Sequence, residues 1–167
     1  NIIVNVQAQN QAKQIYENAQ LSIRILPAAD TYFIDPSVAS SGSGTRSSPY
    51  RSWSNVVIAT GKNYLKKRGT QTTISSQVYI NTNNVLIGAY GNHNDRPIIV
   101  GHNLTGSSNG AMRIGGNNST IRDVDIDAQL STSGIYVGAS TYATVDNCRI
   151  RNSEWAIRTM VSGEGTK

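Results

Sequence analysis

Short apolar stretches, separated by turns rich in Asn and Gly, recur along the chain from about residue 74 onward. Their apolar anchors form two series, and within each series the anchors recur at nearly constant intervals, apart from one longer interval. A period of about 22 to 24 residues, built from short strands and tight turns, is typical of a parallel β-solenoid. A loop over residues 103–109 explains the one longer interval. The two series are Ile87, Ile121 and Val145, and Met112, Ile135 and Ile157.

Strands this short cannot hold a sheet alone, so each coil must pair with the coils on either side, roughly 4.8 Å away. Asn suits the corners between strands because it tolerates left-handed backbone angles. The first coil would present an open sheet edge, which needs a cover. The interval between the last two coils predicts that Ile121, Val124 and Ile126 stack beneath Val145, Cys148 and Ile150.

Residues 5–26 carry the best helical pattern, in which Ala8, Ala12 and Ile15 recur at steps of four and three residues. Pro27 ends this pattern. The apolar stripe is thin and mostly alanine, so the predicted helix must pack against something else to be stable. Packing against copies of itself would form a short coiled-coil neck, and a single docked helix is the alternative.

A predicted strand over residues 31–36 and a Ser/Gly-rich flexible loop over residues 37–48 lead into a second predicted helix. Ser48 as N-cap and Pro49 at the first helical position are its start signals, and Gly61 is its stop. A helix placed before the first coil could cover the open edge of the sheet. The apolar face of this predicted helix consists of Trp53, Val56 and Val57.

The predicted fold class is therefore all-β: a right-handed parallel β-helix (solenoid) with an N-terminal capping helix and a short helical neck. Residues 1–27 are the neck and oligomerisation segment. Residues 28–73 are the cap region, and residues 74–167 are the first coils of a solenoid that continues beyond residue 167.

Composition agrees with a turn-rich β protein. Charged residues make up only 15% of the chain, whereas Gly, Asn, Ser and Thr together supply 65 of 167 residues. The net charge is +5, and the one dense basic run, Lys66-Lys67-Arg68, is interpreted as a solvated strand end. No nucleic-acid motif surrounds it, and no apolar stretch is long enough to span a bilayer, so neither nucleic acid nor a membrane is a predicted partner.

Metal and thiol chemistry find little support in the sequence. Cys148 is the sole cysteine and lies in an alternating apolar stretch, which indicates a buried, inert thiol. His93 and His102 show no metal-ligand spacing with carboxylates, so no metal site is predicted.

The concentrated ionisable cluster is Asp123, Asp125 and Asp127, which strand alternation places on the outward face. One coil later, Arg149 and Arg151 would lie opposite Asp125 and Asp127. Two interpretations compete. Outward carboxylates could serve as acid and base in glycoside cleavage, or with arginine in an elimination. Alternatively, stacked Asp–Arg pairs are typical of a solvated solenoid wall or a trimer contact, and the arginines opposite favour this structural interpretation.

A second candidate is the pair Glu154-Trp155, a carboxylate beside an aromatic ring that could stack on a sugar. The alternative is that Trp155 belongs to the core, as a Trp at the start of an apolar strand commonly does. The candidate carbohydrate-binding residues are Asp125, Asp127, Arg149, Arg151, Glu154 and Trp155.

The opening motif resembles that of pectate-lyase-like right-handed β-helix proteins. This motif comprises Tyr32-Phe33-Ile34-Asp35, a Gly/Ser loop, the run from Gly44 to Trp53, and a strand ending at Thr70. With the predicted helical neck before it and no visible secretion signal, the chain most resembles the N-terminal part of a bacteriophage tailspike. The resemblance covers roughly residues 31–160. Family loops often carry an acidic residue between the glycines, but Ser40-Ser41-Gly42-Ser43-Gly44 has none, so calcium is not indicated. No cofactor is expected.

The resemblance implies a homotrimer in the virion tail, bound to other phage tail or baseplate proteins through its N-terminal segment. Such a tailspike attaches to bacterial surface polysaccharide and usually depolymerises it. A secreted bacterial polysaccharide lyase of β-helix fold and a noncatalytic adhesin or structural fibre are the alternatives. Catalytic carboxylates are expected beyond residue 167, so no catalytic residue is assigned and these residues alone are expected to be inactive.

Overall fold

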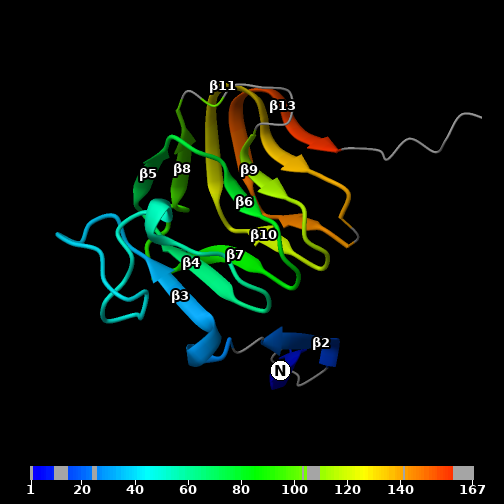
Figure 1. Cartoon of the computed structure of the whole chain (residues 1–167). Helices are drawn as coiled ribbons and strands as arrows, with labels where there is room; N and C mark the ends of the chain where they lie inside the picture. The colour runs from blue at the N-terminus through cyan, green and yellow to red at the C-terminus, as the bar shows by residue number, and fades with distance from the viewer. Residues whose placement is uncertain are drawn as a thin grey trace, which may run out of the picture.

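The computed structural model describes residues 2–9, 15–23, 26–102, 104, 110–140 and 142–159. From residue 31 onward these residues form a parallel β-solenoid whose coils are stacked along one axis (Figure 1). The strands of the first face are β3 (Thr31–Ile34), β4 (Asn63–Lys67), β7 (Leu86–Tyr90), β10 (Thr120–Arg122) and β12 (Thr144–Asp146).

The second and third faces are joined by two long strands that turn from one face to the other. Residues 125–127 of β11 pair with β8, and residues 133–137 pair with β9, so one strand serves both faces. The strand β13 follows β11 in the same way. The strands of these faces are β5 (Gln71–Ile74), β6 (Val78–Ile80), β8 (Ile98–Gly101), β9 (Gly110–Ile114), β11 (Asp125–Val137) and β13 (Arg149–Thr159).

The register between coils confirms both predicted series of anchors. On the first face Ile121 pairs with Ile87 and Val145, and on the third face Ile135 pairs with Met112 and Ile157. Within the described residues, four coils follow β3, and each contributes one strand to the first face. The spacing of side chains, rather than the content of any single strand, therefore predicted the solenoid correctly.

The core is a continuous apolar column inside the coils. Ile126 lies between Ile99 and Ile150 in register, and Ile99 and Ile126 are completely buried. Each fully buried Ile contributes about 1.5–3 kcal/mol relative to an exposed one. Cys148 packs against this core and donates to the carbonyls of Ile121 and Asp146 at 3.7 and 3.2 Å. Burial raises the pKa of its thiol, which keeps it protonated and supports the prediction of an inert residue.

The corner before each first-face strand uses the same backbone conformation in three successive coils. Leu86, Thr120 and Thr144 pair in register on neighbouring coils. The residues two positions before them are Asn84, Asn118 and Tyr142, and their φ angles are 59°, 53° and 59°. Asn adopts this left-handed region more readily than most side chains do, which agrees with the predicted role of Asn at the corners.

The helical neck predicted over residues 5–26 is not found. The described residues there form an antiparallel pair, β1 (Ile2–Gln9) and β2 (Ile15–Ile23). Alternation explains the error, because Val4, Val6 and Ala8 alternate with polar residues in a period of two. The alternation, which predicts a strand, is therefore a better guide here than the thin alanine stripe at three- and four-residue steps, which predicts a helix.

The predicted capping helix is also wrong. Across residues 48–61, all of which the structure describes, one turn of 3-10 helix, Trp53–Asn55, replaces it. The N-cap of this turn is Ser52, whose hydroxyl accepts from the Ser54 amide. The three β-branched residues that follow have poor helix propensity. Trp53 is buried as predicted, and Val56 packs against the core, but Val57 is 84% exposed.

The open edge of β3 is covered by the loop that follows it, drawn in cyan in Figure 1. The Phe33 amide donates to the Gly44 carbonyl at 2.8 Å, and the Asp35 amide donates to the Tyr50 carbonyl at 2.8 Å. The Tyr50 amide donates to the Phe33 carbonyl at 2.9 Å. Gly44, within the loop predicted to be flexible, and Tyr50, just after it, therefore supply backbone partners to the edge, and Tyr50 forms an isolated parallel bridge with Ile34.

Stacked tyrosines close the same end of the solenoid. The ring of Tyr32 lies between Tyr64 and Tyr50, with centroid distances of 5.5 and 6.1 Å. Gly44 packs against this stack at φ +85°, and a Cβ there would lie 2.5 Å from the Tyr50 ring. The loop therefore needs glycine at this position for close packing as well as for its backbone angle.

The basic run was misjudged at its first residue, because Lys66 is fully buried. Its Nζ donates to the carbonyl and hydroxyl oxygens of Thr70 at 2.9 and 2.8 Å. Burial lowers the pKa of Lys66 to about 7, although the negative charge of Asp35 opposes the shift. Lys67 points the other way and pairs with Asp35 at 2.7 Å.

Replacing Trp53 tests the cap. Trp53→Ala should lower the free energy of unfolding by about 3–5 kcal/mol, because it removes a large buried ring at the end of the core. Trp53→Phe should cost much less, since the indole Nε1 has no hydrogen-bond partner among the described residues. Urea denaturation measures both, and equal losses for Ala and Phe would contradict this account of the cap.

Lys66 should make stability depend on pH. Between pH 7 and 8.5 the folded protein loses the Lys66 proton while the unfolded chain keeps it, so stability should rise with pH. The slope approaches about 1.4 kcal/mol per pH unit. Urea denaturation of Lys66→Met should show no such slope, whereas Lys67→Met should retain it. The same pH profile in the parent and Lys66→Met would show that Lys66 is not buried.

Candidate functional site

Polar side chains gather at the corner between the first and second faces of the solenoid. Asp125 pairs in register with Ile98 and Arg149, so Arg96, Asp123 and Asn147 occupy the same position in three successive coils, two residues earlier. Asp123 and Asn147 have φ of 57° and 48°, the left-handed corner conformation. This backbone turn takes the side chains out of the core and onto the outer surface of the corner.

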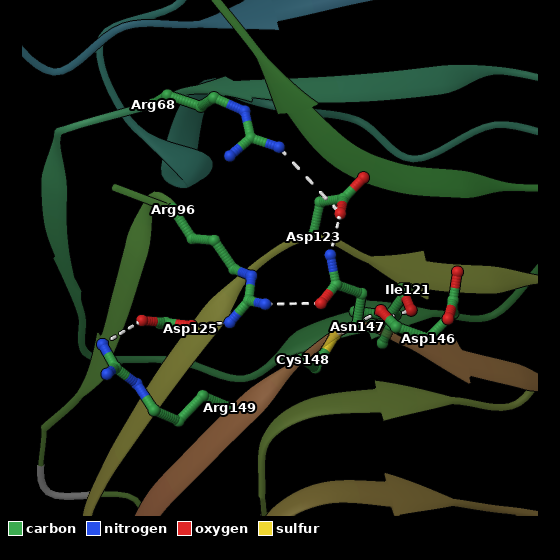
Figure 2. Close-up of polar contacts among 9 residues, drawn as sticks. All are labelled: Arg68, Arg96, Ile121, Asp123, Asp125, Asp146, Asn147, Cys148 and Arg149. Atoms are coloured by element: carbon green, nitrogen blue, oxygen red, sulfur yellow. Dashed lines mark hydrogen bonds and ion pairs between the residues drawn. The ribbon is translucent and has the colours of Figure 1, made fainter. Parts of the chain in front are cut away.

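Asp125 lies between two arginines from the neighbouring coils. Arg96 Nη1 is 3.3 Å from Asp125 Oδ1, and Arg149 Nη2 donates to Asp125 Oδ2 (Figure 2). The predicted pairing of Asp125 with Arg149 is confirmed. Both oxygens of the carboxylate are therefore engaged, and its side chain is only 7% exposed.

Asp123 and Asn147 extend the network toward the first coil. Asn147 Nδ2 donates to Asp123 Oδ1 at 2.6 Å, and Arg96 Nη2 donates to Asn147 Oδ1 (Figure 2). Arg68 Nη2 lies 3.9 Å from Asp123 Oδ1. Four coils thus contribute polar groups to one connected surface, because the parallel register aligns their corners.

The surface is hollowed into a cleft of about 640 Å³, which we call the charged cleft. Two carboxylates line it: Asp125 lies beneath the arginines, and Asp95 is 83% exposed at the surface. Of the arginines, Arg149 is 62% and Arg96 is 31% exposed. Guanidinium and amide groups therefore dominate the side that faces solvent. The lining includes Arg68, Gln71, Asn94, Arg96, Asn147 and Arg149.

Asp127 and Arg151 form a second, separate ion pair farther along the same strands. Arg151 Nε lies 2.9 Å from Asp127 Oδ2, as predicted. Burial disfavours the charged form of Asp127, but donors from Asn152, Gln129 and Arg151 outweigh it and hold the carboxyl pKa below its usual value. A carboxylate held ionised in this way is unsuited to act as a general acid.

Glu154 and Trp155 do not join the charged cleft. Both lie on β13, where Glu154 is exposed and Trp155 is 54% exposed. Trp155 pairs in register with the fully buried Ser133 and lies on the same side of β13 as Ile157, so its exposure does not decide between the core and the sugar-stacking interpretations. The inward-facing Ile157 on the same strand is 45% exposed as well, since no described strand pairs with the outer edge of β13.

Sequence reasoning missed Arg96 and the contribution of Arg68. The missing signal was the interval between Ile98 and Asp125, which is longer than the interval between Asp125 and Arg149 in the next coil. The alignment of Arg96 with Asp123 can be deduced only when the length of this interval is known. Arg68 was grouped with a basic run that actually divides among three environments.

The two predicted carboxylates Asp125 and Asp127 are both engaged by neighbouring donors. The oxygens of Asp125 are both held by arginines, and Asp127 is enclosed by donors. Glycoside hydrolysis needs two carboxyl groups about 5–10 Å apart; of the two that line the charged cleft, Asp125 is engaged on both oxygens and Asp95 is exposed. Within the same residues, no group of three or more His, Cys, Asp or Glu side chains is arranged to hold a metal ion.

Asp125 should stabilise the corner measurably. Asp125→Asn removes the charge between Arg96 and Arg149 and should cost about 1–3 kcal/mol of unfolding free energy, an effect that salt should reduce. Asp95→Asn is the control, because its side chain is 83% exposed and its loss should stay within about 0.5 kcal/mol. Equal effects of the two changes in thermal and urea unfolding would show that the network contributes nothing.

Comparison of the chain with protein-family models, curated proteins and solved structures finds no match. Across the described residues, no helix is both long enough and apolar enough to traverse a bilayer. The parallel solenoid is accordingly defined by the strand pairing of this chain itself.

Proposed function

We propose that this chain attaches to an acidic polysaccharide on the bacterial surface through the charged cleft. The observation that carries the proposal is the layering of charge in the cleft. The Asp125 carboxylate is shielded, and on the outward side the guanidinium groups of Arg96 and Arg149 and the amide of Asn147 outnumber the one exposed carboxylate, that of Asp95. Arg binds carboxylates through paired, charge-assisted hydrogen bonds, and amides bind sugar hydroxyls. The net charge of +5 adds a general attraction for a polyanion.

The extended shape of the solenoid suits a polymeric ligand. Polar groups from four coils lie along the corner, parallel to the solenoid axis, so several sugar residues could contact one protein surface at once. Contacts repeated in this way raise the affinity for a chain above that for a single sugar. A small metabolite would use only a part of this surface.

We further propose that the chain belongs to a pectate-lyase-like right-handed β-helix of a bacteriophage tailspike, assembled as a homotrimer in the virion tail. The resemblance of residues 32–70 supports the pectate-lyase-like part of this proposal, and the covering of β3 by the loop after it agrees with a cap at this place. The helical neck that favoured a tailspike over a secreted lyase is not found in the described residues. Depolymerisation is proposed for the complete spike, with no catalytic residue assigned among the described residues.

Removing one guanidinium from the cleft should weaken binding of the polysaccharide. Arg149→Ala should raise the dissociation constant for an acidic oligosaccharide, such as oligogalacturonate, by about tenfold, because one charge-assisted contact is lost. Binding should also weaken as salt rises. Titration calorimetry against acidic and uncharged oligosaccharides of equal length measures both effects.

Arg151→Ala is the matched control. Arg151 lies two residues along the same strand and pairs with Asp127, outside the charged cleft, and the Asp127 carboxylate keeps Asn152 as a partner. It should leave affinity unchanged. If both variants bind as the parent does, or if no acidic oligosaccharide binds, the charged cleft is not a polysaccharide site.

A further inference from the structure

A ladder of aromatic and cationic side chains runs up the outer surface of the third face. Register pairs Arg113 with Tyr79 on one side and with Tyr136 on the other. The guanidinium carbon of Arg113 lies 4.5 Å from the centroid of the Tyr79 ring and 5.2 Å from that of Tyr136. Both distances are within the range of a cation–π contact, so Arg113 holds the Tyr79 ring in a defined position.

Gly115 fixes the same ring from a second side. A Cβ at Gly115 would lie 2.9 Å from the Tyr79 ring and hydroxyl, so the ring rests directly against the glycine backbone. Tyr136 is nearly buried, but Tyr79 is 40% exposed. Tyr79 is thus a rigid aromatic ring that still offers surface to solvent.

Tyr79 forms one wall of a groove of about 520 Å³ between residues 52–58 of the cap and residues 74–81 of the first coil. We call it the uncharged groove, because none of the described residues that line it carries a charge. Val57, 84% exposed, adds apolar surface. Hydroxyl and amide side chains supply donors and acceptors; they include Ser54, Ser75 and Asn81.

These features match the chemistry of an uncharged pyranose. One face of a pyranose ring is made of C–H groups that stack on an aromatic ring, while its hydroxyl groups need amide or hydroxyl partners around the edge. A rigid aromatic ring loses little conformational entropy when it binds. An acidic sugar would instead leave its carboxylate in this groove without a cationic partner, which is unfavourable.

We propose that the uncharged groove is a second glycan subsite, which holds one neutral pyranose residue stacked on Tyr79. The inference rests on the proposed function in assigning a glycan to this protein, but its site lies at a different corner and recognises a different sugar chemistry from the charged cleft. The protein would then distinguish polysaccharides that contain both uncharged and acidic residues.

The test uses saturation-transfer and titration NMR with a panel of neutral oligosaccharides built from glucose, galactose, mannose or N-acetylglucosamine. At least one should bind at millimolar concentration. Tyr79→Ala should weaken that binding by about three- to tenfold, the range expected for loss of an aromatic stacking contact. Tyr79→Phe keeps the ring and should bind nearly as the parent does.

Two further variants separate the possible outcomes. Gly115→Ala should weaken binding by displacing the Tyr79 ring without removing it, whereas Arg149→Ala should leave neutral sugars unaffected. Loss of acidic binding in Arg149→Ala reports on the proposed function alone. The subsite is overturned if no neutral oligosaccharide binds, or if Tyr79→Ala, folded by circular dichroism, binds neutral sugars as well as the parent.

Discussion

Backbone hydrogen bonds between successive coils determine the position of every other feature in this protein. Short strands such as β4 and β10 have little stability alone, and each becomes stable only by pairing with the coils on both sides. The parallel register then decides which side chains share a level. It aligns Ile99, Ile126 and Ile150 in the core, and by the same spacing it aligns Arg96, Asp123 and Asn147 on the surface. Core and candidate site are therefore two consequences of one pairing.

A solenoid also has an end, and its first strand must be protected from pairing with another chain. Here a glycine-containing loop supplies backbone partners to β3, while Tyr50 and Trp53 cover the end of the core. The cap in turn creates the uncharged groove, because residues 52–58 lie against the first coil. The two proposed subsites thus depend on different parts of the fold: one on the corner register and the other on the cap.

Long-range spacing predicted the coils well, and local patterns predicted the N-terminal region poorly. The Asp125–Arg149 and Asp127–Arg151 pairs followed directly from the interval between the last two coils, because the strand register determines which residues lie opposite each other. The two predicted helices were wrong for different reasons. Over residues 5–26 a weak alanine stripe competed with an alternating strand pattern, and over residues 48–61 the capping signals competed with three β-branched residues. Lys66 was misplaced because a basic run suggests solvent, whereas strand alternation turns its first residue into the core. The uncharged groove had no sequence signal, since the shape of the cap brings its two lining segments together.

The sole cysteine allows the register to be tested directly. Val124 precedes Cys148 by the same interval that pairs Asp125 with Arg149. Val124→Cys should therefore form a disulfide with Cys148 on mild oxidation, since adjacent paired strands bring Cα atoms within disulfide range. Mass spectrometry of the oxidised, digested protein should find this cross-link in Val124→Cys and not in Ile126→Cys, which lies opposite Ile150. Free thiols in the first variant, or an equal cross-link in the second, would contradict the stacking on which both proposed sites depend.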